Sequence, residues 1–219
     1  MKTMMLYLLR HGESLANVEH LFAARKIDPP LSADGIRQIL AQTEVLRDVD
    51  FDGFYTSPLL RARQSTHIVQ RQLGLTPEET DALWEIDVGI FDGRSQKDAQ
   101  NWSLYKEVLK KWERGLHDVR FPDGESLKDV GARFGQFLRG VEDSGNRRIL
   151  VLGHCLLFTA VLWLFCDQHG PIFEDGHMGR GCLSILSKAG ESLRLLKFNV
   201  PPPMSLADQN TPRVKELGR

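Results

Sequence analysis

The sequence contains few cysteines, and they follow no recognisable pattern. Only Cys155, Cys166 and Cys182 are present, and no two of them stand in a C-x-x-C arrangement. An odd number without close pairs argues against both a disulfide framework and a zinc knuckle. We therefore expect a protein of a reducing compartment, namely the cytoplasm.

An excess of charge of either sign is also missing. Lysine and arginine together number 28, aspartate and glutamate together number 29, and the net charge is -1. Proteins that bind nucleic acids or membrane surfaces usually carry a basic excess. We therefore expect neither as a partner, and any cationic site must be local.

Apolar runs long enough to cross a membrane are scarce as well. The one candidate, residues 149–166, reaches the lower length limit of a spanning helix, but Gly153 and His154 interrupt it. We interpret residues 149–153 as a strand buried on both faces, because such strands are apolar throughout, followed by a buried helix. Residues 4–9 are too short for the core of a signal peptide.

What is present is an alternation of strand and helix patterns. We expect strands at residues 4–9, 51–56 and 149–153, helices at residues 32–46, 57–73, 104–112 and 126–141, and a hairpin of residues 182–186 and 193–198. Ser57-Pro58 is interpreted as the start of its helix, and residues 83–93 as loop with a short extended piece. This pattern predicts an α/β fold, a three-layer sandwich around a central, mostly parallel sheet with one antiparallel strand.

The length of 219 residues suits one domain. We expect residues 1–200 to form it, with a small helical cap around residues 95–122. Residues 201–219, which begin with three prolines, are expected to form an extended tail.

Polar and charged residues follow three of the predicted strands. Arg10-His11 follows the first, residues 57–61 follow the second, and His154 follows the third. Ligands of parallel α/β sheets bind beyond the carboxyl ends of the strands, so these side chains should converge on one rim.

Together these residue types suit phosphoryl transfer. The guanidinium groups of Arg10 and Arg61 match phosphate oxygens with paired hydrogen bonds. His11 can act as a nucleophile, and nearby arginines favour its unprotonated form. His154 can donate to the transferred group, and Glu85 can give a proton to the leaving alcohol and later activate water. The scheme needs no metal or other cofactor, and the sequence has no H-E-x-x-H or evident carboxylate cage.

Each of these residues also has an ordinary structural explanation. A histidine after a strand is more often a polar or capping residue, Arg61 alone could lie on a helix surface, and Glu85 could be a solvated loop acid. His154, inside an apolar run, could equally be a hydrogen-bonded core histidine. Only the combination points to catalysis.

Several short motifs, in order, resemble one known family. The string LLRHGES with Asn17 is similar to the signature of the histidine phosphatase (phosphoglycerate mutase-like) superfamily. Its resemblance continues in LSADG (residues 31–35), TSPLLRARQST (56–66), LWEIDVGIFDG (83–93), PDGES (122–126) and VLGH (151–154). The resemblance covers residues 4–198 and implies the family's α/β sandwich.

The resemblance also implies roles for individual residues. His11 would be the phosphorylated histidine, Arg10, Arg61 and His154 would complete the phosphate pocket, Asn17 would add a hydrogen bond, and Glu85 would be the acid/base. One departure is Cys155-Leu156, where the family usually has glycine after the second histidine. Cys155 could be a redox-sensitive thiol, but a small apolar filler is the favoured interpretation.

The resemblance leaves three functions open. Mutases of this family carry a long insertion after the acid, and the stretch between Glu85 and His154 is too short for one. We therefore predict a phosphatase acting on a small-molecule phosphate monoester through a phosphohistidine. The first alternative is a 2,3-bisphosphoglycerate-dependent phosphoglycerate mutase, and the second is a non-enzymatic protein that binds phospho-ligands.

The physiological substrate is not determined by the sequence. Residues 104–118 and 173–180, which include Lys106, Trp112, His117, His177 and Arg180, are expected to form the pocket wall. An exposed edge strand near the C-terminal hairpin could pair between two copies, so a homodimer is also an option.

Overall fold

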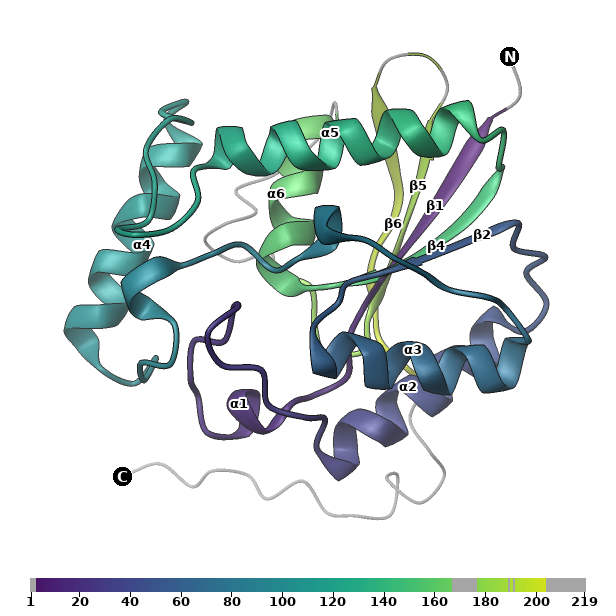
Figure 1. The fold of residues 1–219 in the computed structure, drawn as a ribbon, viewed down its shortest axis with the longest axis horizontal. Coiled ribbons are helices and arrows are strands. Elements are labelled where there is room, and N and C mark those ends of the chain that lie inside the picture. The colour runs from purple at the N-terminus through teal and green to yellow at the C-terminus, as the bar shows by residue number, and fades with distance from the viewer. Residues whose placement is uncertain (1–2, 167–176, 189, 191, 204–219) are drawn as a thin grey trace.

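A single sheet of six strands runs through the computed structural model, which describes residues 3–166, 177–188, 190 and 192–203 (Figure 1). The strand order is β3-β2-β4-β1-β5-β6, and β5 is antiparallel to both of its neighbours while the remaining pairs are parallel. The predicted mostly parallel sheet with one antiparallel strand is confirmed. The strands are β1 (Met4–Arg10), β2 (Gly53–Thr56), β3 (Glu78–Glu79), β4 (Arg148–Gly153), β5 (Leu183–Lys188) and β6 (Leu193–Val200).

Helices cover both faces of this sheet, which makes three layers (Figure 1). On one face lie α2 (Ala33–Leu46) and α3 (Leu60–Leu73), and on the other lie α5 (Leu127–Asp143) and α6 (Cys155–Phe165). Strand β4 shows why its sequence is apolar throughout. Ile149 and Val151 join the core beneath α5 and α6, whereas Leu150 and Leu152 join the core beneath α2 and α3.

The described residues form four further helical segments. They are α1 (Leu15–Val18), η1 (Asp81–Leu83), η2 (Gly89–Phe91) and α4 (Ala99–Glu113). Helix α4 is longer than predicted and lies at one end of the molecule, beyond the sheet (Figure 1). The division into one domain, a cap and a tail stays a prediction, and residues 204–219 lie outside the described residues.

Most helix boundaries follow from local capping. The Ser32 hydroxyl accepts the N–H of Gly35 at the start of α2. Ser126 and Asp129 form a capping box at the start of α5. Gly74, with φ of 68°, ends α3 in the left-handed conformation that glycine adopts without strain.

The predicted start of α3 at Ser57-Pro58 is wrong by two residues. The helix begins at Leu60, whose N–H donates to Oδ2 of Asp28 at 2.5 Å. A carboxylate from a distant loop therefore supplies the cap. Ser57 itself serves another purpose, since its hydroxyl contacts His154.

The segment of residues 83–93 also differs from the prediction. It contains the 3-10 turn η2 in place of an extended piece, and the short strand β3 lies earlier in the chain. Gly89 has φ of 56° and lies so close to residues 122–124 that a side chain there would meet the Pro122 carbonyl at 1.8 Å. This close approach requires glycine and favours the turn.

The long apolar run of residues 149–166 divides at His154 into β4 and α6, as predicted. In the part of the chain that the structure describes, no helix has both the length and the apolar character that crossing a membrane requires.

Candidate active site

The two strands that precede the histidines are neighbours in the sheet. Arg10 of β1 lies in register with Gly153 of β4, and the N–H of His11 donates to the Gly153 carbonyl at 3.0 Å. The ring centroids of His11 and His154 are consequently 5.1 Å apart. The predicted convergence of the two imidazoles on one rim is confirmed.

His11 is buried, and its hydrogen bonds identify its tautomer. Its Nδ1 lies 2.6 Å from the Gly12 carbonyl, which can only accept, so Nδ1 carries the hydrogen. The Nε–H of Arg61 points to the other nitrogen, Nε2, at 3.3 Å. Burial first, and then the guanidiniums of Arg61 and Arg10, hold the pKa of His11 well below its ordinary value of 6.5. At neutral pH the ring is therefore uncharged, with its lone pair on Nε2.

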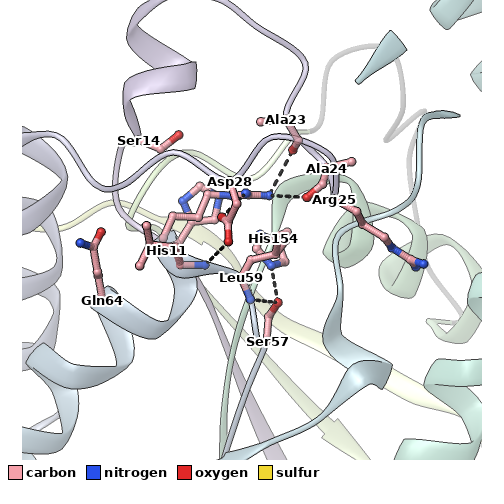
Figure 2. Close-up of polar contacts among 12 residues, drawn as sticks. His11, Ser14, Ala23, Ala24, Arg25, Asp28, Ser57, Leu59, Gln64 and His154 are labelled. Atoms are coloured by element: carbon pink, nitrogen blue, oxygen red, sulfur yellow. Dashed lines mark hydrogen bonds and ion pairs between the residues drawn. The ribbon is translucent and has the colours of Figure 1, made fainter. Parts of the chain in front are cut away.

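Arg61 is a buried cation with a full set of partners. Its Nη1 donates to Oδ1 of Asp28 at 3.1 Å, and its Nη2 donates to the carbonyls of Ala23 at 3.1 Å and Ala24 at 3.5 Å (Figure 2). Burial lowers the pKa of Arg61, and the charges of Glu85 and Asp28 oppose that effect. The guanidinium therefore stays charged beside His11.

The loop that binds Arg61 is itself held by Asp92. The carboxylate of Asp92 accepts the consecutive backbone N–H groups of Ala24 (3.1 Å), Arg25 (2.7 Å) and Lys26 (2.6 Å). Asp28 and Asp92 were both missed by sequence reasoning, because an aspartate in a loop carries no signal of a distant partner.

His154 is fully buried and bonded to Ser57. Its Nε2 lies 2.7 Å from the Ser57 hydroxyl, which also accepts the N–H of Leu59 at 3.3 Å (Figure 2). Because a hydroxyl can both donate and accept, Ser57 can bond the His154 ring whether the ring hydrogen is on Nε2 or on Nδ1. That Nδ1 has no partner among the described residues. Burial and the charge of Arg61 lower the pKa of His154 well below 6.5.

Glu85 is bound at the start of α6. Its carboxylate accepts the N–H groups of Leu157 (2.8 Å), Leu156 (3.1 Å) and Ile86 (2.8 Å). Since α6 begins directly after His154, these bonds hold the Glu85 carboxyl group close in the structure to the backbone that follows the second histidine. Helix N-terminal N–H groups are natural partners of a carboxylate.

Arg10 completes the charged part of the site. Its Nη1 donates to the Met178 carbonyl at 2.5 Å, while its buried Nε has no partner in the described part of the chain. Arg10, His11, Arg61 and Glu85 all line one cavity of about 410 Å³. A buried donor without an acceptor is costly, so the unpartnered Nε of Arg10 suits an anion in this cavity. His154 lies behind His11 and is not among the described residues that line the cavity.

Two glycines allow the loop after β1 to pack tightly against α2. A side chain at Gly12 would meet the Gly35 carbonyl at 2.2 Å, and one at Gly35 would meet the Glu13 carbonyl at 2.1 Å. The glycines of RHGE and LSADG are thus required by close backbone contact next to the nucleophile candidate.

A comparison with known proteins agrees with this geometry. The model of the histidine phosphatase superfamily (branch 1) matches residues 6–201. The chain belongs to the histidine phosphatase superfamily.

Within this superfamily, the chain is similar to proteins with two kinds of name. It is 38% identical over 134 residues to the 2,3-bisphosphoglycerate-dependent phosphoglycerate mutase of Rhizobium meliloti. The matched region covers 58% of this chain and 62% of the mutase. It thus spans less than two thirds of the length of the mutases it matches. It is 28% identical over 199 residues to the uncharacterized phosphatase PhoE of Bacillus subtilis, and this match covers 90% of this chain and 95% of that protein.

The fold of the superfamily is also found among solved structures. The mycobacterial glucosyl-3-phosphoglycerate phosphatase superposes with a TM-score of 0.78, covering 91% of this chain and 100% of that one at 22% identity. At this identity the likeness establishes the fold.

Two further residues that the sequence analysis singled out, Asn17 and Cys155, also line the cavity. Asn17 lines the cavity, but its Oδ1 accepts the N–H and hydroxyl of Ser14 and so caps α1. Cys155 also lines the cavity, and burial raises the pKa of its thiol, which disfavours the reactive thiolate.

The predicted pocket wall is partly wrong. Trp112 is fully buried in the aromatic core, and Lys106 is exposed. The described residues that line the cavity do not include Trp112, Lys106 or His117. Helix α4 contributes Trp102 and Tyr105 instead, because they lie on the side of the helix that faces the site. His177 and Arg180 line the cavity as predicted, and residues 173–176 lie outside the described residues.

Proposed function

We propose that this protein is a phosphatase that hydrolyses phosphate monoesters through a phosphohistidine on Nε2 of His11, without a metal ion or other cofactor. The observation that carries the proposal is the state of His11. Its Nε2 bears a lone pair, and its ring is held neutral by burial and by two guanidiniums that can also bind the phosphate.

The reaction has two steps. Nε2 of His11 attacks phosphorus, the bond to the ester oxygen breaks, and that oxygen takes a proton from the Glu85 carboxyl group. Water then attacks phosphorus, Glu85 takes a proton from that water, and the P–N bond breaks to release inorganic phosphate. Each step uses Glu85 once, as the acid and then as the base.

The other groups stabilise charge on the transferred phosphoryl group. The guanidiniums of Arg10 and Arg61 place positive charge beside its oxygens, the unpartnered Nε of Arg10 donates to one of them, and His154 adds a further donor. Asn17 is positioned on the cavity wall to add an amide hydrogen bond. None of these contacts changes protonation state during the reaction.

The replacement His11→Ala tests the nucleophile. We expect hydrolysis of p-nitrophenyl phosphate to fall by at least about a thousandfold, because the covalent route is lost. In the unchanged protein, rapid acid-free quenching should trap a phosphoryl group on His11, detected by mass spectrometry of the peptide that contains it.

The matched control is His67→Ala, which removes an exposed histidine of α3. It should keep both the activity and the trapped phosphoryl group. Undiminished hydrolysis by the His11→Ala protein would contradict the assignment, as would trapping at another residue. Phosphate binding without any turnover in the unchanged protein would favour the non-enzymatic alternative.

The mutase relatives support a second candidate, a 2,3-bisphosphoglycerate-dependent phosphoglycerate mutase. The test is interconversion of 3- and 2-phosphoglycerate with and without 2,3-bisphosphoglycerate. Interconversion that depends on the bisphosphate, together with negligible release of phosphate from monoesters, would favour the mutase.

We also propose a cytoplasmic location and a small-molecule phosphate ester as partner. None of the three cysteines forms a disulfide in the structure, which suits a reducing compartment. A homodimer and the absence of nucleic-acid partners stay predictions. Strand β6 lies at the sheet edge with Leu196 and Phe198 exposed, so sedimentation of the purified protein would test pairing there.

A further inference from the structure

One part of the cavity wall is aromatic. Phe22, Trp102 and Tyr105 line the cavity and contact one another. The ring centroids are 4.7 Å apart for Phe22 and Tyr105, 5.6 Å for Trp102 and Tyr105, and 5.9 Å for Phe22 and Trp102. The sequence analysis included Tyr105 in the expected pocket wall of residues 104–118 and assigned no role to Phe22 or Trp102.

This aromatic wall is backed by the protein core. Tyr105 stacks on Phe121 with centroids 5.2 Å apart, and Phe22 contacts Phe91 at 6.0 Å. Phe91 and Phe121 are fully buried. The wall is therefore held in place before any ligand binds, which lowers the entropic cost of binding an apolar group against it.

Two polar side chains near this wall, Arg180 and Gln96, have internal partners. Nη1 of Arg180 is paired with Glu13 at 3.1 Å, and the side-chain amide of Gln96 donates to the Leu21 carbonyl at 3.1 Å. Burial and the charge of Arg10 lower the pKa of His177, which leaves that ring neutral at pH 7. The cations among the described lining residues are thus Arg10 and Arg61 at the phosphate site and Arg180, whose charge is offset by Glu13.

We propose that this site selects phosphate monoesters whose alcohol carries an aromatic or other apolar ring and no carboxylate. The inference rests on the proposed phosphatase function and adds the class of leaving group to it. The apolar part of the alcohol packs against Phe22, Trp102 and Tyr105 while the phosphate is bound by Arg10 and Arg61. Aromatic walls of this kind recognise ring systems by burial and stacking.

The test compares three esters of primary alcohols, so that leaving-group acidity differs little. They are benzyl phosphate, glycerol 3-phosphate and 3-phosphoglycerate. We expect kcat/KM for benzyl phosphate to exceed both others by at least about tenfold, the scale of discrimination that an apolar pocket provides. Benzylphosphonate should likewise inhibit at least about ten times more tightly than methylphosphonate.

The variant Trp102→Ala should lower kcat/KM for benzyl phosphate about tenfold and leave glycerol 3-phosphate hydrolysis nearly unchanged. Leu104→Ala, an exposed site on the same helix, is the matched control and should change neither. Phosphonate inhibition of the unchanged protein provides a readout if Trp102→Ala does not fold.

The outcomes separate this inference from the proposed function. Equal kcat/KM for the three esters, a preference for 3-phosphoglycerate, or equal losses for both esters in Trp102→Ala would overturn the substrate class while leaving the phosphatase intact. Hydrolysis of none of them by the unchanged protein would contradict the phosphatase itself.

Discussion

At the scale of single residues, Arg61 shows how one side chain joins separate parts of the site. Its three nitrogen atoms donate in different directions, to His11, to Asp28 and to the carbonyls of Ala23 and Ala24. The planar fork of a guanidinium satisfies all of them at once, which the single ammonium group of lysine cannot do. The charge is therefore not the only property that the site requires of this position.

The substitution Arg61→Lys tests that requirement. We expect the free energy of unfolding to fall by about 3 kcal/mol, because buried carbonyls and the Asp28 carboxylate lose partners. We expect kcat/KM for phosphate monoesters to fall at least about a hundredfold. Urea unfolding and steady-state kinetics measure the two effects.

The control is Arg63→Lys, an exposed position of the same helix that is bridged to Glu79. It should leave stability and kinetics unchanged. If Arg61→Lys were equally neutral, charge alone would suffice and the geometric role of the fork would be refuted.

At the scale of elements, helix α5 and the turn before it hold the segment that carries Glu85. Arg133 of α5 donates to the Ala82 carbonyl at 2.6 Å and to both carboxylate oxygens of Glu125, at 3.0 and 3.2 Å. Glu125 in turn accepts the N–H of Asp87 at 2.9 Å. The segment is thus fastened on both sides of Glu85, and its central carboxyl group lies where α6 begins.

Removing this support should displace Glu85 without removing it. For Arg133→Met we expect kcat to fall about tenfold with a smaller change in KM, because the acid/base moves relative to the phosphate. Stability should fall by about 2 kcal/mol, as for the loss of charged hydrogen bonds at a mostly buried site. Kinetics over a range of substrate concentrations separate kcat from KM.

Lys128→Met is the comparison within the same helix, since Lys128 pairs with Asp118 on the surface. That variant should match the unchanged protein in both measurements. A rise in KM without a loss of kcat in Arg133→Met would mean that the cluster supports substrate binding rather than Glu85.

At the scale of the whole molecule, the site exists only when the sheet is complete. Strands β1 and β4 stand far apart in the sequence and become neighbours through parallel pairing. That pairing buries His11 and His154 side by side, and the half-buried His177 lines the same cavity, where the charge of Arg10 acts on it. Three histidines are therefore kept unprotonated by the folded state, with pKa values below the ordinary 6.5.

This arrangement predicts how stability depends on pH. Below about pH 6.5 the unfolded chain protonates these histidines while the folded protein does not, so the unfolded state binds more protons and stability falls as pH falls. The slope should approach about 1.4 kcal/mol per pH unit for each histidine, and it lasts until the folded-state pKa values are reached. Urea unfolding between about pH 7.5 and 5.5 measures it.

Carboxylates do not account for the same window. Asp129, whose pKa is lowered chiefly by the backbone N–H of Ser126, contributes only as pH falls below about 3.8. His154→Gln should reduce the slope, whereas His67→Gln, which changes an exposed histidine, should preserve it. A free energy of unfolding that stays constant over this range would show that the histidines are not held neutral.

Much of the fold was predictable because the signals are local. The caps formed by Ser32, by Ser126 with Asp129 and by Gly74 use residues within one helical turn, so the sequence determines them by itself. The apolar character of β4 likewise indicated a strand buried on both faces. The start of α3 was mispredicted because its cap comes from Asp28, far away in the chain.

The candidate site divides in the same way. The sequence by itself determined the candidate residues, since Arg10, His11, Arg61, Glu85 and His154 each stand in a short motif or directly after a predicted strand. Only the tertiary structure decided the tautomer of His11 and the burial that is the largest cause of its lowered pKa. It also decided the support from Asp92, Glu125 and Arg133, and the aromatic wall of Phe22, Trp102 and Tyr105. Those properties depend on burial and on partners from distant segments, and neither exists until the sheet and its covering helices have come together.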